Sequence, residues 1–364
     1  MRHLVFILVF FFFLCSLAHG KRIRVGVAGM THNHINQVFN YFGKQDEVMI
    51  VGFAEPNQTL AMQLLKKNHL PDSLWFSTLE ELIRKTKPDA VCAFNSIFQH
   101  LEVVKICAPK GIHVIVEKPL AVNMQHLNEM RALVKKHNIH LLTNFETTWY
   151  PSHLKMWEMV KNEKSLGTIR KVVIMDGHKG PIEIGCTPEF TDWLTDPVQN
   201  GGGALVDFGC YGANIMTWLM DGQKPISVTA VTHQFKPTIY PKVDDEATII
   251  LGYPTCQAII QASWNWPFDR KDTEVYGTDG MLIANKENKM KYIAGNRVGK
   301  ETFLDLSPLP HARSNVFSYL AAVVNGEIDP DKDLSSFAVN EIVVEILSAA
   351  KESAKTGQTI YLRN

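Results

Sequence analysis

Lys118 is the side chain of this sequence whose setting points most directly to chemistry. It follows the apolar stretch Ile112–Val116 and lies between Glu117 and Pro119. This pattern predicts a buried strand that presents the lysine at its carboxyl end, where open α/β sheets bind their ligands. A surface lysine that merely follows a strand is the alternative interpretation. We take Lys118 as a candidate catalytic ammonium.

Asp207 and Tyr211 form a second candidate group, directly after the glycine run Gly201–Gly203. Their i, i+4 spacing puts both side chains on one face of a helix. A phenol titrates near pH 10, and a neighbouring ammonium such as Lys118 would lower its pKa toward a value useful in proton transfer. Asp207 would then orient a substrate hydroxyl. Alternatively, Asp207 caps the helix and Tyr211 packs in a core.

The elements that must position these groups fall into two patterns. Up to Asn144, short apolar strands alternate with amphipathic helical stretches, which predicts βαβ units and a parallel sheet covered on both faces. The expected strands are Ile23–Gly29, Val48–Glu55, Ala90–Phe94, His113–Glu117 and His140–Asn144. We therefore expect an α/β fold whose residues 21–146 form a Rossmann-type, doubly wound domain.

After Pro151 the pattern becomes a long Pro- and Gly-rich loop, a helix over Asp207–Met220, and closely spaced strands joined by tight turns. It predicts a C-terminal α+β domain, residues 147–364, with a large and mostly antiparallel open sheet. We expect its last helix, Val339–Ala354, to pack back on the first domain. An open sheet of this kind can serve as a subunit interface, which predicts a homo-oligomer, a dimer or a tetramer.

The first 20 residues have the pattern of a secretory signal peptide. A basic start, Met1–His3, precedes the apolar run Leu4–Leu17, and Ala18–Gly20 ends with small residues near a cleavage site at Gly20. The apolar run is shorter than the ~20 residues of a membrane-spanning helix, although an uncleaved anchor is the alternative. We expect a periplasmic or secreted protein without stable membrane insertion.

Composition narrows the partners further. Lys plus Arg number 37 and Asp plus Glu number 37, so no charge surplus favours nucleic acid. The five cysteines that follow the signal are widely spaced and odd in number, which argues against a disulfide framework. No CxxC motif or His/Cys cluster is visible, so we predict no metal site.

The signatures around Lys118 and Asp207 together resemble the family of glucose-fructose oxidoreductase, inositol dehydrogenase and rhizopine catabolism proteins (Gfo/Idh/MocA). The resemblance covers nearly the whole chain after the signal. It implies a nicotinamide cofactor, with Lys118 between nicotinamide and substrate. The family usually pairs the aspartate with a histidine base, where this chain has Tyr211; some exported sugar oxidoreductases of the family also carry tyrosine there. Glu146 replaces a frequent arginine.

The first strand ends at Gly29 and leads into Met30-Thr31-His32-Asn33-His34. A dinucleotide's pyrophosphate would rest here on a helix N-terminus. Thr31 stands where the dinucleotide-binding fingerprint has its second glycine, and His34 stands where it has its third. The sequence therefore lacks two of the three glycines at the expected spacing. The hydroxyl of Thr31 and the imidazoles of His32 and His34 could contact phosphate instead. The alternative is a turn with two solvent-facing histidines.

Four further residues are candidate cofactor contacts. Glu55 ends the second strand, where an acid accepts hydrogen bonds from ribose hydroxyls and repels a 2′-phosphate, which favours NAD over NADP. It could instead cap the following helix. Asn95 and His100 flank the turn where the resemblance places the nicotinamide half, although a helix cap by Ser96 is the alternative. Glu117, beside Lys118, completes the set.

The candidate substrate contacts are Asn144, His178 and Trp193. Asn144 ends a strand on the ligand side of the sheet, and His178 lies in the long loop. Trp193, like Trp264, could offer a flat face to a sugar ring, although large aromatic side chains are more often core residues.

The resemblance and the signal together predict an exported NAD(P)-dependent oxidoreductase that acts on a secondary alcohol of a sugar or polyol. Because free NAD is scarce outside the cytoplasm, we expect the dinucleotide to be tightly held. Two alternatives are an NAD-assisted glycoside hydrolase of the same family and a non-catalytic carbohydrate-binding protein on this fold.

Overall fold

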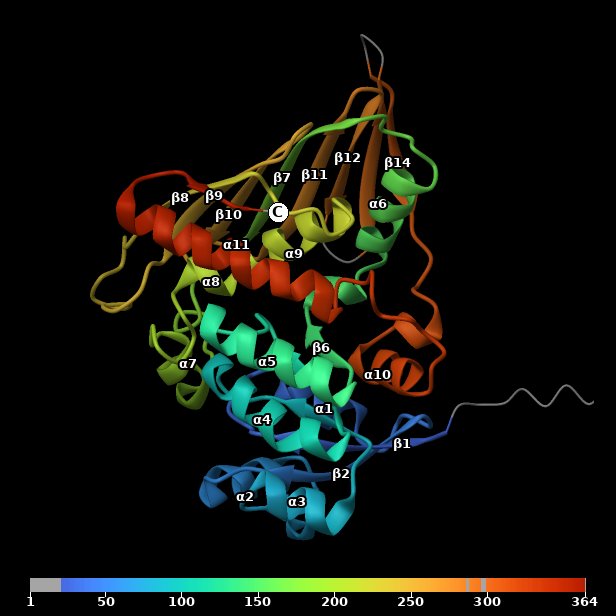
Figure 1. The fold of residues 1–364 in the computed structure, drawn as a ribbon, viewed down its shortest axis with the longest axis vertical. Helices are drawn as coiled ribbons and strands as arrows, with labels where there is room; N and C mark the ends of the chain where they lie inside the picture. The colour runs from blue at the N-terminus through green and yellow to red at the C-terminus, as the bar shows by residue number, and fades with distance from the viewer. Residues whose placement is uncertain (1–20, 286–287, 296–298, 364) are drawn as a thin grey trace, which may run out of the picture.

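A computed structural model describes residues 21–285, 288–295 and 299–363. The predicted signal peptide lies outside the described residues. The chain forms two sheets that lie one above the other in Figure 1, each with its own helices.

The first sheet has six parallel strands in the order β3-β2-β1-β4-β5-β6. This order is that of doubly wound dinucleotide-binding folds. The strands are β1 (Ile23–Ala28), β2 (Val48–Ala54), β3 (Trp75–Phe76), β4 (Ala90–Ala93), β5 (His113–Glu117) and β6 (Leu141–Asn144). They are almost wholly buried because helices cover both faces.

The connections of this sheet are short helices with side-chain caps. Asn57, Thr78 and Asn123 each accept a hydrogen bond from the first turn of the helix that follows. The helices are α1 (Ile35–Tyr41), α2 (Gln58–Lys67), α3 (Leu79–Thr86), α4 (His100–Cys107) and α5 (Met124–His137), with short 3₁₀ turns η1 (Asp72–Leu74), η2 (Ile97–Gln99) and η3 (Ala108–Lys110).

The second sheet has nine strands in the order β14-β13-β12-β11-β7-β10-β9-β8-β15. Only β7 and β10 run parallel; the other neighbours are antiparallel. The strands are β7 (Ile169–Gly177), β8 (Ser227–His233), β9 (Glu246–Gly252), β10 (Gln257–Ser263), β11 (Arg270–Gly277), β12 (Gly280–Asn285), β13 (Lys289–Ala294), β14 (Glu301–Asp305) and β15 (Ile360–Tyr361). The predicted fold class is confirmed.

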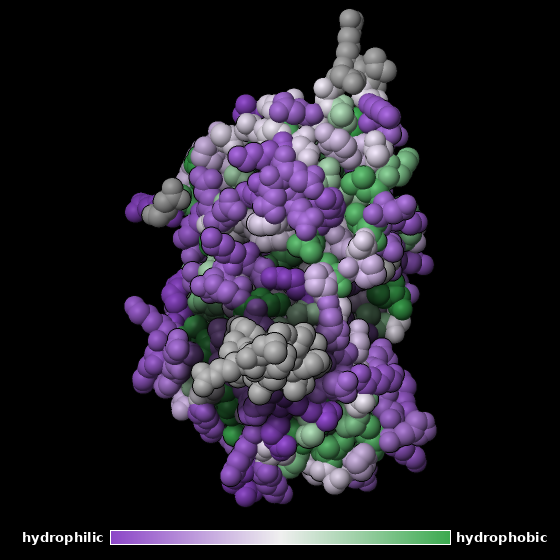
Figure 2. Space-filling view, turned by 90° about the vertical axis from the view of Figure 1, so that its right-hand side faces the viewer, coloured by the Kyte–Doolittle hydropathy of each residue, from purple (hydrophilic) through white to green (hydrophobic). Residues whose placement is uncertain are grey.

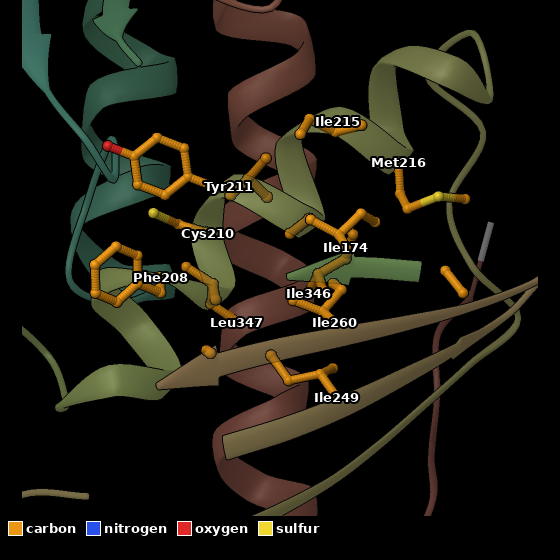
Figure 3. Close-up of a cluster of buried hydrophobic side chains, with 14 of the residues drawn as sticks. Ile174, Phe208, Cys210, Tyr211, Ile215, Met216, Ile249, Ile260, Ile346 and Leu347 are labelled. Carbon is orange, nitrogen blue, oxygen red and sulfur yellow. The ribbon is translucent and has the colours of Figure 1, made fainter. Parts of the chain in front are cut away.

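The second half of the chain contains the helices α6 (Pro151–Lys161), α7 (Pro188–Leu194), α8 (Ala204–Asp207), α9 (Gly209–Leu219), α10 (Val316–Val324) and α11 (Phe337–Thr356), with 3₁₀ turns η4 (Glu146–Trp149) and η5 (His311–Arg313). Of these, α6, α8, α9 and α11 pack on the second sheet. We expected a single helix over Asp207–Met220. In the structure Asp207 ends α8 and a separate helix, α9, begins at Gly209, with the break at Phe208. Figure 3 shows side chains of α11, among them Leu347, packed over Ile249 and Ile260 of the sheet.

The last helix was predicted to pack back on the first domain, and part of its surface does so. α11 packs mainly on β8 and α9 of the second domain, and it touches α5 and β6 of the first. The helix that enters the core of the first domain is α10, whose Phe317 and Leu320 join Val25 and Phe53 in one buried cluster. α10 was not predicted, because an apolar stretch of this length has no periodicity that separates a short helix from a strand.

Among the described residues, no helix is long and apolar enough to cross a membrane. The face shown in Figure 2 is largely hydrophilic, with apolar side chains in scattered patches.

Candidate active site

Lys118 and Asp207 meet at the centre of a pocket between the two sheets. Lys118 follows β5 and Asp207 ends α8, and their side chains are almost fully buried. The ammonium donates hydrogen bonds to Asp207 Oδ1 and, at 3.0 Å, to its main-chain oxygen. Burial alone would lower the pKa of Lys118, but Asp207 raises it to about 12. Lys118 is therefore a fixed cation and does not act as a base near neutral pH.

The second oxygen of Asp207 is also occupied. Trp264 Nε1 donates to Asp207 Oδ2 over 2.9 Å. Burial favours the neutral acid, yet Lys118 keeps the pKa of Asp207 below its usual value. Trp264 is thus no platform for a sugar ring; it holds the carboxylate in place.

Tyr211 lies beside this pair and lines the same pocket, but its surroundings oppose the lowered pKa that was expected from the sequence. The Lys118 ammonium lies 5.1 Å from the centroid of the Tyr211 ring. The side chain is buried in the cluster of Figure 3, and burial together with Glu146 raises the pKa of Tyr211 well above its usual value. Desolvation of a phenolate outweighs a cation over the ring. Tyr211 therefore remains a neutral phenol.

The pocket has a volume of about 300 Å³ and two kinds of wall. Its polar wall consists of Lys118, Asp207, Glu146, Lys271, Arg270, Asp269, His32, His34 and His178. Its less polar wall includes Phe190, Leu194, Phe208, Pro181, Ile184, Cys186 and the ring of Tyr211. This size suits one sugar-sized ring with a polar edge and an apolar face.

A second ammonium–carboxylate pair, Lys271 with Glu146, lines the same pocket. Lys271 on β11 donates to Glu146 Oε2, and its Nζ lies 5.0 Å from the centroid of the Tyr211 ring. Burial opposes ionisation of Glu146, but Lys271 and the Tyr150 hydroxyl bring its pKa down to about 2. Two ion pairs therefore flank one aromatic ring.

His32 and His34 lie at this pocket; His32 is buried, contrary to the solvent-facing alternative, whereas the His34 side chain is 28% exposed. His34 Nδ1 lies 2.9 Å from Glu117 Oε2, and His32 Nε2 lies 3.9 Å from the same oxygen. Burial opposes ionisation of Glu117, but the two imidazoles and Asn144 lower its pKa to about 2. The three side chains, predicted as cofactor contacts, form one cluster, and its two histidines line the pocket that contains Lys118 and Asp207.

This cluster has the composition of a metal site, with ligand atoms within 4.8 Å of one another. However, the main-chain N–H of His34 donates to His32 Nδ1 over 3.0 Å. A neutral His32 must then carry its hydrogen on Nε2, the atom that would bind the metal. The hydrogen-bond pattern therefore makes His32 a donor toward Glu117.

Two predicted substrate contacts instead support this cluster. Asn144 Nδ2 donates to Glu117 Oε1 over 2.7 Å, and Trp149 Nε1 donates to Asn144 Oδ1 over 3.0 Å. Trp193 packs 5.5 Å from the His32 ring, centroid to centroid. Neither Asn144 nor Trp193 lines the pocket, so both predictions are wrong in role.

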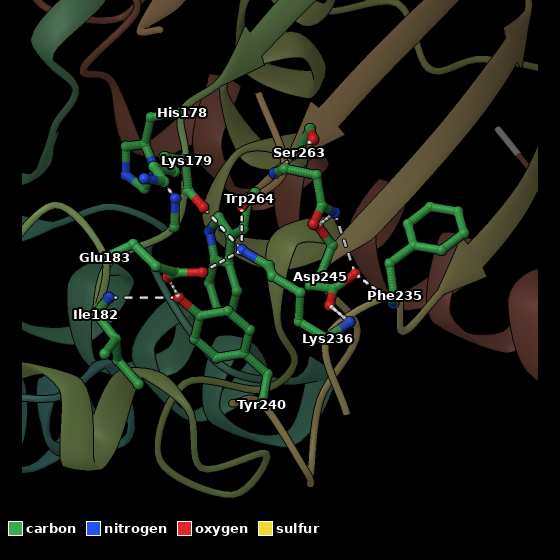
Figure 4. Close-up of polar contacts among 12 residues, drawn as sticks. His178, Lys179, Ile182, Glu183, Phe235, Lys236, Tyr240, Asp245, Ser263 and Trp264 are labelled. Carbon is green, nitrogen blue, oxygen red and sulfur yellow. Dashed lines mark hydrogen bonds and ion pairs between the residues drawn. The ribbon is translucent and has the colours of Figure 1, made fainter. Parts of the chain in front are cut away.

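His178 does line the pocket, at the end of a loop that a polar network fastens. Lys236 Nζ donates to Lys179 O, Glu183 Oε1 and Trp264 O over 2.5–2.7 Å, as Figure 4 shows. His178 Nδ1 accepts the N–H of Gly180 over 2.9 Å. This network fixes both the loop and Trp264, and through Trp264 the carboxylate of Asp207.

A separate cavity of about 510 Å³ opens at the carboxyl ends of β1, β2 and β4. Four of the residues predicted to contact the cofactor, Gly29, Thr31, Glu55 and Asn95, line this cavity. Gly29 has φ +78°, and an added Cβ would lie 2.6 Å from Asn95 Cβ. Only glycine allows this turn to pass so close to Asn95.

Two other predicted cofactor contacts do not line this cavity. Met30 is a core residue, and its N–H donates to Glu55 Oε2 over 2.8 Å. His100 is fully buried with Nδ1 3.2 Å from Leu120 O, and burial lowers its pKa to about 4. Ser96 and Gln99 form a capping box, the alternative considered for this turn.

Comparison with known proteins identifies the chain. A family model described as "Oxidoreductase family, NAD-binding Rossmann fold" matches residues 23–145, and one described as "GFO/IDH/MocA C-terminal domain" matches residues 153–283. The chain belongs to the Gfo/Idh/MocA family of oxidoreductases. The resemblance predicted from the sequence is therefore confirmed.

Curated relatives and solved structures agree with this family. The chain is 26% identical over 313 residues to trans-1,2-dihydrobenzene-1,2-diol dehydrogenase of Xenopus laevis, covering 83% of this chain and 89% of that protein. The human protein of the same name is 25% identical over 245 residues, which cover 65% of this chain and 66% of that protein. An aldose-aldose oxidoreductase from Caulobacter crescentus has a TM-score of 0.78 at 19% identity and covers 94% of this chain and 100% of its own. An inositol dehydrogenase homologue complexed with NAD⁺ from Azotobacter vinelandii has a TM-score of 0.79 at 16% identity over 94% and 98% of the chains.

The cavity fits the dinucleotide of Gfo/Idh/MocA proteins. Asn95 Oδ1 is buried and has no hydrogen-bond partner among the described residues, so it can accept from a ligand hydroxyl or amide. The close turn at Gly29 lets main-chain N–H groups approach phosphate. Glu55, held by the N–H groups of Met30 and Asn57, still has acceptor capacity.

Two pocket residues of this Gfo/Idh/MocA protein could not be assigned from the sequence. Lys271 is the second residue of β11, which follows a Pro-containing turn, and no motif marks it. Glu146 was noted only as a departure from the family pattern. Their pairing joins residues 125 positions apart, which only the folded chain reveals.

Proposed function

We propose that this protein is an exported, NAD-dependent oxidoreductase that transfers hydride between nicotinamide and a secondary alcohol of a sugar or polyol. The observation that supports it best is the buried Lys118–Asp207 pair, which is in a ring-sized pocket between the domains. A bound nicotinamide would accept the hydride. Lys118 donates to the substrate oxygen and stabilises the negative charge that develops there, and Asp207 and Trp264 fix its position.

Both ion pairs support a substrate with neighbouring hydroxyl groups. A hydroxyl donates one hydrogen bond and accepts others, and an ammonium–carboxylate pair offers both partners. Lys118 with Asp207 would hold the reacting hydroxyl, and Lys271 with Glu146 the next one. Because each charge in these pairs is balanced, the pairs favour a neutral polyol over a sugar acid.

The cavity at the first sheet supports NAD over NADP. Its charged lining residues are Glu55, Glu80 and Glu102, with no lysine or arginine among the described lining residues. Three carboxylates would repel a 2′-phosphate.

Export and assembly are further parts of the proposal. The apolar N-terminal stretch supports export, which a fusion of residues 1–20 to a periplasmic reporter enzyme would test.

Ile250 and Ile259 lie half-buried on the sheet face opposite the helices, which supports pairing of two open sheets. Light scattering of the wild type and of Ile259→Lys would measure the oligomeric state.

The central test uses purified protein. Mass spectrometry after denaturation would detect retained NAD, and added NAD⁺ should raise the melting temperature. Nicotinamide absorbance would then be followed with D-glucose, D-xylose, myo-inositol and trans-1,2-cyclohexanediol as trial substrates. A protein that neither contains nor binds a nicotinamide dinucleotide would exclude the proposed function.

A further inference from the structure

Asp207 ends a helix, α8, that follows the glycine run Gly201–Gly203 directly. This helix has four residues, and the residue at its N-cap, Gly203, has no side chain with which to cap it. So short a helix gains little order from its own hydrogen bonds, because helix nucleation is unfavourable. The position of Asp207 is therefore set by residues outside α8.

Asp244, in the connection between β8 and β9, supplies the missing cap. Its Oδ1 accepts the main-chain N–H of Gly203 over 3.0 Å, and its Oδ2 accepts that of Leu205 over 2.6 Å. Its main-chain oxygen accepts the N–H of Ala204 over 3.0 Å. One residue of another segment thus holds three successive N–H groups at the start of α8, which fixes the direction of this helix.

Lys351, on α11, holds the other end of the glycine run. Its ammonium donates to Gly201 O over 3.1 Å and to Val122 O over 3.0 Å. Val122 lies in the first domain, four residues after Lys118, and Gly201 lies six residues before Asp207. One side chain therefore joins the segment that carries Lys118 to the segment that carries Asp207.

The glycine run fits closely against these partners. Gly201 has φ +89°, and an added Cβ would lie 3.0 Å from Val122 O and 3.5 Å from Lys351 Nζ. Asn200 Nδ2 donates to Gly202 O over 2.8 Å and closes the turn from within. A side chain at position 201 would push the run away from Val122.

We propose that Lys351 and Asp244 are positioning residues that together set the contact between Lys118 and Asp207. This inference rests on the proposed function, which assigns that contact to the substrate hydroxyl. Lys351 fixes the separation of the two segments, and Asp244 fixes the direction of α8. Neither side chain lines the pocket, so each acts through Asp207 and not on the substrate. A displacement of about 1 Å at a reacting group can cost ~100-fold in rate.

The first experiment needs no cofactor and uses Trp264 as the reporter, because its indole N–H donates to Asp207 Oδ2 over 2.9 Å. The indole ¹H–¹⁵N resonance of Trp264, assigned with Trp264→Phe, should move upfield in Lys351→Met and in Asp244→Ala as this hydrogen bond weakens. An unmoved Trp264 resonance in both variants would overturn the inference.

The matched control is Arg131→Met. Arg131 also joins the first domain to α11, through an ion pair with Glu341 over 2.8 Å, and among the described residues it has no hydrogen bond to the glycine run. Arg131→Met and Lys351→Met should both lower the melting temperature, because each removes a contact between the domains. Only Lys351→Met should move the Trp264 resonance.

The second experiment measures turnover on whichever trial substrate the wild type oxidises fastest. Lys351→Met should lower kcat ~10–100-fold, while the substrate KM and the NAD⁺ dissociation constant change by less than about threefold. Lys351→Arg keeps a cation that can donate to both carbonyl oxygens, so it should restore most of the rate. Arg131→Met should keep the wild-type kcat. A lower melting temperature with an unchanged kcat in Lys351→Met would show a merely structural role and refute the proposal.

Two glycine variants test the same geometry without removing a polar group. Gly201→Ala and Gly222→Ala both introduce a Cβ at positive φ, +89° and +77°, so both should lower the free energy of unfolding. The added Cβ meets Val122 O at position 201 but no atom within 4 Å at position 222. Only Gly201→Ala should therefore move the Trp264 resonance and lower kcat. Equal effects of the two variants on that resonance would count against the inference, whereas absence of dinucleotide binding would count against the proposed function alone.

Discussion

The ammonium of Lys118 donates hydrogen bonds to a side-chain oxygen and to the main-chain oxygen of Asp207. This contact joins the end of β5 in the first domain to α8 in the second, with both side chains at most 8% exposed. The pair that would orient the substrate therefore also connects the domains. Stability and activity should depend on the same two residues.

Lys118→Met should abolish turnover and also destabilise the fold. The substitution leaves the carboxylate of Asp207 buried without its partner, which costs about 3–5 kcal/mol. Urea unfolding would measure this loss. The double variant Lys118→Met/Asp207→Asn should recover part of the stability but none of the activity. Equal unfolding free energies of the wild type and Lys118→Met would show that water solvates the Asp207 carboxylate in the variant and replaces the lost ion pair.

Acid should weaken the protein through Glu117. Its pKa is about 2 in the folded chain against an ordinary 4.5, so its contribution is complete above pH 4.5 and is lost as the pH falls toward 2. The shift corresponds to a contribution of order 3 kcal/mol. Glu117→Gln should therefore show a shallower loss of unfolding free energy over this range. Parallel curves for the two proteins would mean that Glu117 titrates normally.

Lys271→Met should remove the preference for a neighbouring hydroxyl. We expect wild type with bound NAD⁺ to bind trans-1,2-cyclohexanediol at least ~10-fold more tightly than cyclohexanol, and the variant to bind both about equally. Isothermal titration calorimetry would measure the four affinities. Lys161→Met is the matched control, because Lys161 pairs with Asp221 on the surface over 2.7 Å. A variant that weakens both ligands alike would point to a structural role.

Glu55→Gln should relax cofactor preference. The amide oxygen can still accept from one of the two N–H groups that Glu55 holds, those of Met30 and Asn57, and the substitution removes a charge from the cavity. We expect the ratio of NADP⁺ to NAD⁺ affinity to rise ~10-fold, since one repulsive charge near a 2′-phosphate is removed. Fluorescence titration with both dinucleotides would check this, with the surface substitution Glu163→Gln as reference. An unchanged ratio would place the 2′ position away from Glu55.

Local pattern was sufficient for much of the fold. Both sheets were predictable because their signals come from residues that are neighbours in the chain. These signals are the apolar residues and turn residues of the strands and the apolar faces of α2 and α5. α10 was missed because nothing next to Val316–Val324 in the chain shows that its partners are Val25 and Phe53.

The sequence by itself determined which residues can do chemistry: Lys118 after a buried strand, Asp207 after a glycine run, and Gly29 at a turn that only glycine can form. The tertiary structure decided what each of them does. Burial made Tyr211 a neutral phenol, two main-chain N–H groups chose the tautomers of His32 and His178, and Glu117 chose that of His34. A pKa and a hydrogen position depend on solvent exclusion and on neighbours that are distant in the chain, and folding alone brings these together.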